Sequence, residues 1–132
     1  MHELHIGFTY DAEDDYRHEF GPPDPPDAYA EFDSMETIRD IESSLEQRGW
    51  RVERIGHVYR LLDALRAGRR WDLVFNIAEG LRGRNREAQV PLILEMFGVP
   101  FVGSDALTMA LTLDKTMAKR VVASCGVPTP RF

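Results

Sequence analysis

The sequence predicts a Rossmann-like three-layer αβα domain, with a mainly parallel sheet of about four strands between two layers of helices. Two observations favour this fold class. Short apolar runs alternate along the chain with longer segments whose apolar residues recur at helical spacing. The run Leu73–Val74–Phe75 is apolar without alternation, as expected of a central parallel strand that is covered on both faces.

The expected strands are short. In the first, Leu4, Ile6 and Phe8 alternate with other residues, which is typical of a strand. The last, Val99–Val102, lies between a glycine and a Gly–Ser pair. The four strands are expected near residues 3–9, 51–56, 72–76 and 99–102.

The first regular helix is expected to begin at Asp33 or Ser34, because either side chain can cap it. Glu36 follows Asp33 at the spacing of a capping box, and Gly49 ends the helix. Further helices are expected over residues 58–65, 90–97, 106–111 and 115–124.

Residues 10–32 form an acidic and proline-rich segment. Its centre is Pro22–Pro23–Asp24–Pro25–Pro26, a composition that excludes helix and strand, so we expect an extended or mobile loop. A solvated insertion is the simpler interpretation, and a lid over the sheet edge is the alternative. The domain is expected to span residues 1–127, and residues 128–132, with two prolines, to begin a linker or strand towards further domains.

Composition excludes several classes of function. The chain has 132 residues, 43% of them hydrophobic, and a net charge of −6, which argues against a nucleic-acid partner. We expect neither a signal peptide nor a membrane span, because the first residues lack a basic segment followed by an apolar run and no apolar run reaches the length of a span. Cys125 is alone, so we expect no internal disulfide, a buried thiol and a cytoplasmic protein.

Polar residues follow the third expected strand directly. Glu79 and Gly80 come at its carboxyl end, where open α/β sheets bind ligands, so Glu79 is a candidate for binding an ammonium group. The alternative is a loop carboxylate that caps a nearby amide. Arg84 and Arg86 follow in a short glycine-containing loop that lacks both phosphate-binding glycine motifs. These arginines either neutralise an anionic ligand or pair with neighbouring glutamates, and the second role is favoured.

Asp114 is expected to cap the last helix, which Lys115 begins. Lys115 is either a surface lysine or a cation directed at a ligand between this domain and a following one. The four histidines are scattered, so a zinc site is not expected.

From Asp72 onward the chain resembles the N-terminal domain of D-alanine–D-alanine ligases, members of the ATP-grasp superfamily. The resemblance is carried by a strand, a loop with two glycines, a Gln and a Leu–Glu pair, then a Gly–Val–Pro–Phe–Val–Gly–Ser run and a Leu–Asp–Lys run. The matching residues are Gly80, Gly83, Gln89, Leu94–Glu95, Gly98–Ser104, Leu113–Lys115, Lys119 and Gly126–Pro130.

The resemblance implies an ATP-dependent carboxylate–amine ligase. In such enzymes ATP activates a carboxylate as an acyl phosphate, an amine attacks to give an amide, and Mg²⁺ neutralises the phosphates. The Mg²⁺ ligands and most ATP contacts of the family lie in domains outside this chain, so the chain alone is expected to be inactive. Its expected partners are an amino-acid or small carboxylate substrate and those ATP-grasp domains, and a homodimer stays open.

The sequence departs from the family around the amino-acid subsite. The family has a glycine-rich turn and a Glu–Val–Ser segment where this chain has Glu31, Asp33 and Ser34 after the acidic segment. It also has His–Gly in place of Glu79–Gly80, and an acidic pair in place of Arg84–Asn85. By resemblance, the substrate-binding candidates are Glu31, Asp33, Ser34, Glu79, Gly80 and Arg84, the ATP-binding candidate is Lys115, and the substrate need not be D-alanine.

Two other functions are considered. A receiver-type signalling module is also a small acidic α/β domain, but it needs an aspartate at the end of its third strand, where this chain has Phe75–Asn76. A non-catalytic binding role for an ATP-grasp relative is the second alternative.

Overall fold

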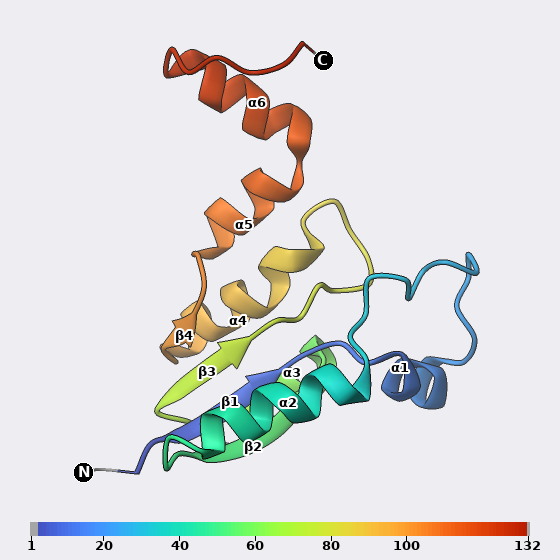
Figure 1. The fold of residues 1–132 in the computed structure, drawn as a ribbon, viewed down its shortest axis with the longest axis vertical. Coiled ribbons are helices and arrows are strands. Elements are labelled where there is room, and N and C mark those ends of the chain that lie inside the picture. The colour runs from blue at the N-terminus through green and yellow to red at the C-terminus, as the bar shows by residue number, and fades with distance from the viewer. Residues whose placement is uncertain (1–2, 132) are drawn as a thin grey trace.

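A four-stranded sheet in which all strands are parallel organises the domain (Figure 1). The computed structural model describes residues 3–131, and within them the strand order is β2-β1-β3-β4. The predicted fold class is confirmed, and β3 lies inside the sheet because it pairs with both β1 and β4. The strands are β1 (His5–Thr9), β2 (Arg51–Gly56), β3 (Leu73–Asn76) and β4 (Phe101–Val102).

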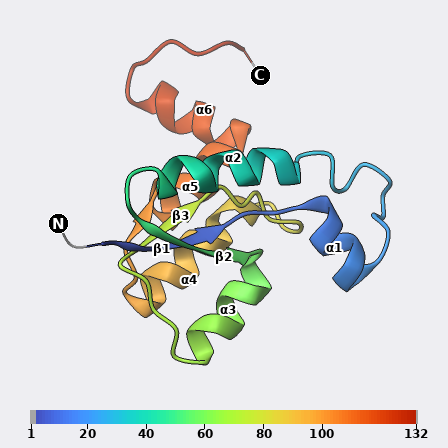
Figure 2. The same ribbon diagram turned by 60° about the horizontal axis from the view of Figure 1, so that its bottom comes forward.

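Helices cover both faces of the sheet, as a buried parallel sheet requires. Figure 2 shows α2 (Met35–Glu46) on one face and both α3 (Val58–Arg66) and α4 (Gln89–Phe97) on the other. Each face has its own core. The core under α2 includes Phe8, Tyr10, Ala12 and Ile38, and the larger core under α3 and α4 includes Ile55, Leu61, Leu65, Trp71, Val74, Val90, Leu94 and Val99.

The segment after β1 differs from the expected extended loop because it begins with a helix, α1 (Glu13–Phe20). Three acidic residues occupy the first turn of α1, where they complement the positive end of the helix dipole. Tyr16 is fully buried and attaches α1 to the domain. The prolines begin only after Gly21, so they exclude helix from the second part of the segment and leave the first part free to fold.

The chain returns to the sheet at Asp33, whose backbone N–H donates to the Asp11 carbonyl at 2.9 Å. Helix α2 then begins with Ser34 as its cap, because the Ser34 hydroxyl accepts the backbone N–H of Thr37 at 3.1 Å. Of the two cap residues that the sequence allows, Asp33 and Ser34, it is therefore Ser34 that caps the helix.

The last two helices, α5 (Ala106–Leu113) and α6 (Lys115–Ser124), extend away from the sheet (Figure 1). Among the described residues, neither helix has a buried one. The expected burial of the Cys125 thiol is wrong, since Cys125 follows α6 and is exposed. None of the helices in residues 3–131 is long and apolar enough to cross a membrane.

Candidate functional site

The loops that follow β1 and β3 meet at the carboxyl edge of the sheet. Because the strand order is β2-β1-β3-β4, the chain leaves β1 towards one side of the sheet and later returns to the other side. The switch point therefore lies between β1 and β3, and ligands of open parallel sheets bind in the crevice outside such a point. The candidate site is built by Asp11 after β1, by Glu79 and Gly80 after β3, and by Glu31, Arg86 and Glu87.

Asp11 ties these loops together, and sequence reasoning missed it. Its side chain is almost completely buried. One carboxylate oxygen accepts the Tyr16 hydroxyl at 2.8 Å, and the other accepts the backbone N–H of Gly80 at 2.7 Å. Burial and the Asp11 carboxylate both raise the pKa of the Tyr16 hydroxyl, so it stays a donor. The sequence signal was a carboxylate two residues after a strand, which the surrounding acidic residues obscured.

Glu79 lies in a cluster with Glu31, Arg86 and Glu87. Burial, together with the neighbouring Glu87 and Glu31 carboxylates, raises the pKa of Glu79, while the Arg86 guanidinium opposes that rise. Arg86 itself forms an ion pair with Glu31, although the two lie far apart in sequence. Three carboxylates and one guanidinium leave the cluster with an excess of negative charge. Such a cluster suits a cationic group such as a substrate ammonium.

Asp33 and Ser34 line a different cleft, of about 260 Å³, between α1 and α2. Burial, and then the Asp11 carboxylate, raise the pKa of Asp33. The Ser34 hydroxyl is engaged in capping α2. The structure thus brings Glu31 and Glu79 together and places Asp33 and Ser34 beside the β1 side of the edge.

Gly80 has a positive φ of 73°, which favours glycine. A Cβ atom at this position would lie 2.6 Å from the Arg86 carbonyl oxygen. Gly80 therefore lets two backbone segments approach closely and holds Glu79 at the strand end.

Arg84 contacts the start of α6, which Lys115 begins. The Arg84 guanidinium forms an ion pair with Asp114. Asp114 caps α6 by accepting the backbone N–H of Met117 at 3.0 Å, and that bond, followed by Arg84, lowers the pKa of the Asp114 carboxyl. Lys115 is the exposed first residue of α6. The expected cap is therefore present, and the substrate-binding and ATP-binding roles of Arg84 and Lys115 stay predictions.

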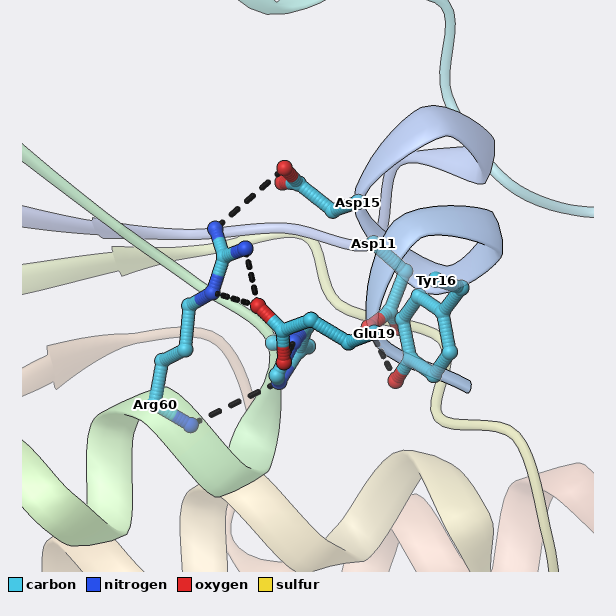
Figure 3. Close-up of polar contacts among 6 residues, drawn as sticks. Asp11, Asp15, Tyr16, Glu19 and Arg60 are labelled. Atoms are coloured by element: carbon cyan, nitrogen blue, oxygen red, sulfur yellow. Dashed lines mark hydrogen bonds and ion pairs between the residues drawn. The ribbon is translucent and has the colours of Figure 1, made fainter. Parts of the chain in front are cut away.

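A second polar network fastens α1 to the start of α3 (Figure 3). The Glu19 carboxylate lies 2.9 Å from Nε2 of the buried His57 and accepts Nε of Arg60 at 2.6 Å. Asp15 pairs with Arg60 at 3.3 Å. His57 Nδ1 accepts the backbone N–H of Arg60 at 3.4 Å, so Nε2 carries the hydrogen that Glu19 accepts. Burial by itself would raise the pKa of Glu19. The Arg60 hydrogen bond and His57 together outweigh it, so the pKa is lowered.

Asn76, at the end of β3, has a structural role. Its side-chain oxygen accepts the Thr9 hydroxyl at 2.8 Å and the backbone N–H of Ala78 at 3.2 Å. It thereby joins β1 to β3 at the position where a receiver would carry its phosphorylated aspartate. Within residues 3–131, no group of three or more His, Cys, Asp or Glu side chains is arranged to hold a metal ion.

Comparisons with known proteins agree with the resemblance seen in the sequence. No protein-family model matches the chain. The chain is 38% identical over 99 residues to a D-alanine–D-alanine ligase of Xylella fastidiosa. The aligned region covers 75% of the chain and 32% of that ligase. It is 35% identical over 99 residues to D-alanine–D-alanine ligase B of Xanthomonas campestris, covering 75% of the chain and 31% of that protein. An uncharacterized protein of Sinorhizobium fredii is 50% identical over 60 residues, or 46% of the chain and 18% of that protein.

The chain thus spans about a third of the length of the curated ligases that it matches. The chain is therefore an N-terminal domain of the kind found in D-alanine–D-alanine ligase-like proteins of the ATP-grasp superfamily.

Proposed function

We propose that this chain supplies the amino-acid-binding part of an ATP-dependent carboxylate–amine ligase. The observation that carries the proposal is the convergence of Glu31 and Glu79 at the switch point of the sheet. In this role, Glu79 accepts hydrogen bonds from the ammonium group of an amino-acid substrate. Glu31 adds negative charge, and Arg86 keeps the Glu31 carboxylate in place through their ion pair.

A substrate ammonium would also balance the excess negative charge of the Glu79 cluster. The pKa of Glu79 is raised because burial removes water and because the Glu87 and Glu31 carboxylates lie beside it. A bound cation would favour the ionised form of Glu79 and relieve the repulsion among these carboxylates. Binding is then accompanied by loss of a proton from the cluster wherever Glu79 was protonated before.

ATP and Mg²⁺ would supply the activated phosphoryl group in the complete enzyme. Among the described residues, Lys115 is the one that we propose to face the phosphates, because it begins α6 with its side chain exposed. This chain has no phosphate-binding glycine motif, so the rest of the nucleotide site would come from other domains. We accordingly propose that the chain alone neither binds ATP tightly nor hydrolyses it.

We assign residues 1–127 to this domain and residues 128–132 to the beginning of a linker. In support, residues 127–131 form neither helix nor strand. Location in the cytoplasm and a homodimer stay predictions.

The test is kinetic and uses the longest natural protein that contains this chain, assayed with ATP, Mg²⁺ and a panel of amino acids. Glu79→Gln should raise KM for the amino acid about tenfold or more, since a decade corresponds to about 1.4 kcal/mol. Glu36→Gln, on the exposed side of α2, is the matched control. Wild-type KM in Glu79→Gln with an intact fold would refute the assignment.

Lys115→Ala should instead raise KM for ATP and leave KM for the amino acid unchanged. Arg120→Ala removes another exposed cation from the same helix and serves as the control. Calorimetry on the 132-residue chain completes the test, and micromolar affinity for ATP would contradict the proposal.

A further inference from the structure

The proline-rich segment forms one wall of a pocket that the ligase proposal does not use. The pocket has a volume of about 420 Å³, within the range of small-molecule sites. It lies where the end of α1 and the segment after it meet the first turn of α3 and the loop after Gly80. Its lining residues are Phe20, Pro22, Asp24, Pro25, Ala28, Tyr29, Tyr59, Leu81 and Arg82.

Three aromatic rings give this pocket an apolar wall. Phe20 and Tyr59 are each about 50% exposed although they lie in contact, with ring centroids 5.5 Å apart. Tyr29 is held from behind, because its ring stacks on Phe32 at 5.1 Å and its hydroxyl donates to the Gly21 carbonyl at 3.1 Å. The wall is therefore formed before any ligand arrives, while two of its rings keep surface available for one.

The same pocket carries one group of each charge. Asp24 and Arg82 both line it and both are exposed. Within residues 3–131, neither side chain has an ion-pair or hydrogen-bond partner. The loop that carries Arg82 is nevertheless fixed, because the Arg82 carbonyl accepts Nε2 of Gln89 at 2.8 Å. A carboxylate and a guanidinium beside an apolar wall match a ligand that has an ammonium, a carboxylate and an apolar body.

We propose that this pocket binds a free aromatic amino acid. Arg82 pairs with the ligand carboxylate, Asp24 pairs with the ligand ammonium, and the ligand ring packs against Phe20, Tyr29 and Tyr59. This site shares no residue with the Glu79 cluster and adds an aromatic wall that the cluster lacks. The proposal goes beyond the ligase function and does not depend on it, because binding here requires neither ATP nor amide formation.

The test is a titration of the 132-residue chain, labelled with ¹⁵N, followed by the backbone amide signals of Tyr29, Tyr59, Leu81 and Arg82. The probes are phenylalanine of either configuration, phenethylamine, 3-phenylpropionate and alanine. At least one phenylalanine enantiomer should shift these signals saturably. Phenethylamine and 3-phenylpropionate, which each lack one charged group, should bind about tenfold more weakly, and alanine should not bind measurably.

Two variants test the charged groups. Arg82→Gln should weaken phenylalanine binding about threefold to tenfold and leave the binding of phenethylamine, which has no carboxylate, unchanged. Asp24→Asn should weaken phenylalanine binding to a similar extent and leave the binding of 3-phenylpropionate, which has no ammonium, unchanged. Arg66→Gln and Asp40→Asn are controls at exposed positions outside the pocket. Absence of phenylalanine-induced shifts, equal affinity for all three phenyl probes, or wild-type affinity in both variants would each overturn the proposal. Loss of ligase activity in Glu79→Gln has no bearing on this result, so the two proposals fail separately.

Discussion

The backbone N–H of Gly80 donates to the buried Asp11 carboxylate at 2.7 Å and thereby joins the loop after β3 to the loop after β1. The second oxygen of the same carboxylate accepts the Tyr16 hydroxyl at 2.8 Å, so helix α1 is held by the same group. Glu79 immediately precedes Gly80 in the chain. The position of the proposed ammonium-binding carboxylate therefore depends on a residue whose own side chain is almost completely buried.

Asp11→Ala should lower the free energy of unfolding by about 1–3 kcal/mol, because it leaves a buried hydroxyl and a buried N–H without their acceptor. Urea denaturation followed by circular dichroism measures the change. Asp40→Ala removes an exposed aspartate from α2 and should change stability by less than about 0.5 kcal/mol. Equal effects of the two substitutions would show that the Asp11 bonds contribute little.

Gly80→Ala should destabilise the domain more than Gly68→Ala does. Both glycines have positive φ, 73° and 84°, so both substitutions carry the backbone strain of an L residue there. A Cβ atom at position 68 meets open space, whereas at position 80 it lies 2.6 Å from the Arg86 carbonyl oxygen. The difference in unfolding free energy should be about 1 kcal/mol or more. Similar melting curves for the two variants would argue against close backbone packing at Gly80.

Glu79→Gln should stabilise the ligand-free domain at neutral pH. The pKa of Glu79 is raised above its ordinary value of 4.5 in the native state, chiefly by burial and then by Glu87. Because the pKa of Glu79 is higher in the native state than in the unfolded chain, its contribution to stability is greatest below the pKa it has in the unfolded chain. That contribution is lost as the pH rises through the pKa it has in the native state. Removing the charge should thus raise Tm at about pH 7, and the gain should vanish near about pH 3.5. Glu36→Gln controls for the change in net charge, and a gain that persists in acid would contradict this explanation.

Glu19→Ala should loosen α1, because it removes the acceptor of both His57 and Arg60. The pKa of Glu19 is lowered, so its contribution is present above the unfolded pKa and is lost as the pH falls through the native value. We expect a loss of about 1 kcal/mol near neutral pH, since both Glu19 and Arg60 are partly solvated, and a smaller loss in acid.

The matched control for Glu19 is Glu13→Ala in the same helix. Glu13 pairs with Arg17 one turn away on the exposed surface. Such pairs contribute only about 0.3–0.5 kcal/mol. Amide hydrogen exchange in α1 gives the readout, and protection that Glu19→Ala leaves unchanged would show that Tyr16 alone attaches the helix.

The sheet and its covering helices could be predicted because their signals are local. The apolar run Leu73–Phe75 identified an interior strand, and the residues before Met35 identified a helix start. Helix α1 could not be identified in the same way, because Tyr16 is its one buried residue and a single apolar position makes no periodic pattern. Its other attachments, to His57 and Arg60, depend on residues about forty positions away that only folding brings close.

The candidate site was predictable in part for the same reason. The strand end fixed the location of Glu79, since the carboxyl ends of parallel strands meet at one edge. The Arg86–Glu31 pair joins residues 55 positions apart, and no spacing rule connects them. Arg84 was the more prominent candidate by resemblance, yet its partner in the structure is Asp114, at the start of α6.

The protruding α5 and α6 indicate where the cooperatively folding unit ends. Both cores are complete with residues up to Phe101, and no residue of the last two helices joins either one. Leu107, Met117, Val121 and Val122 keep between 39% and 77% of their surface exposed. Caps such as Asp105 and Asp114 stabilise these two helices locally, so we expect the helices to open at a lower free energy than the sheet.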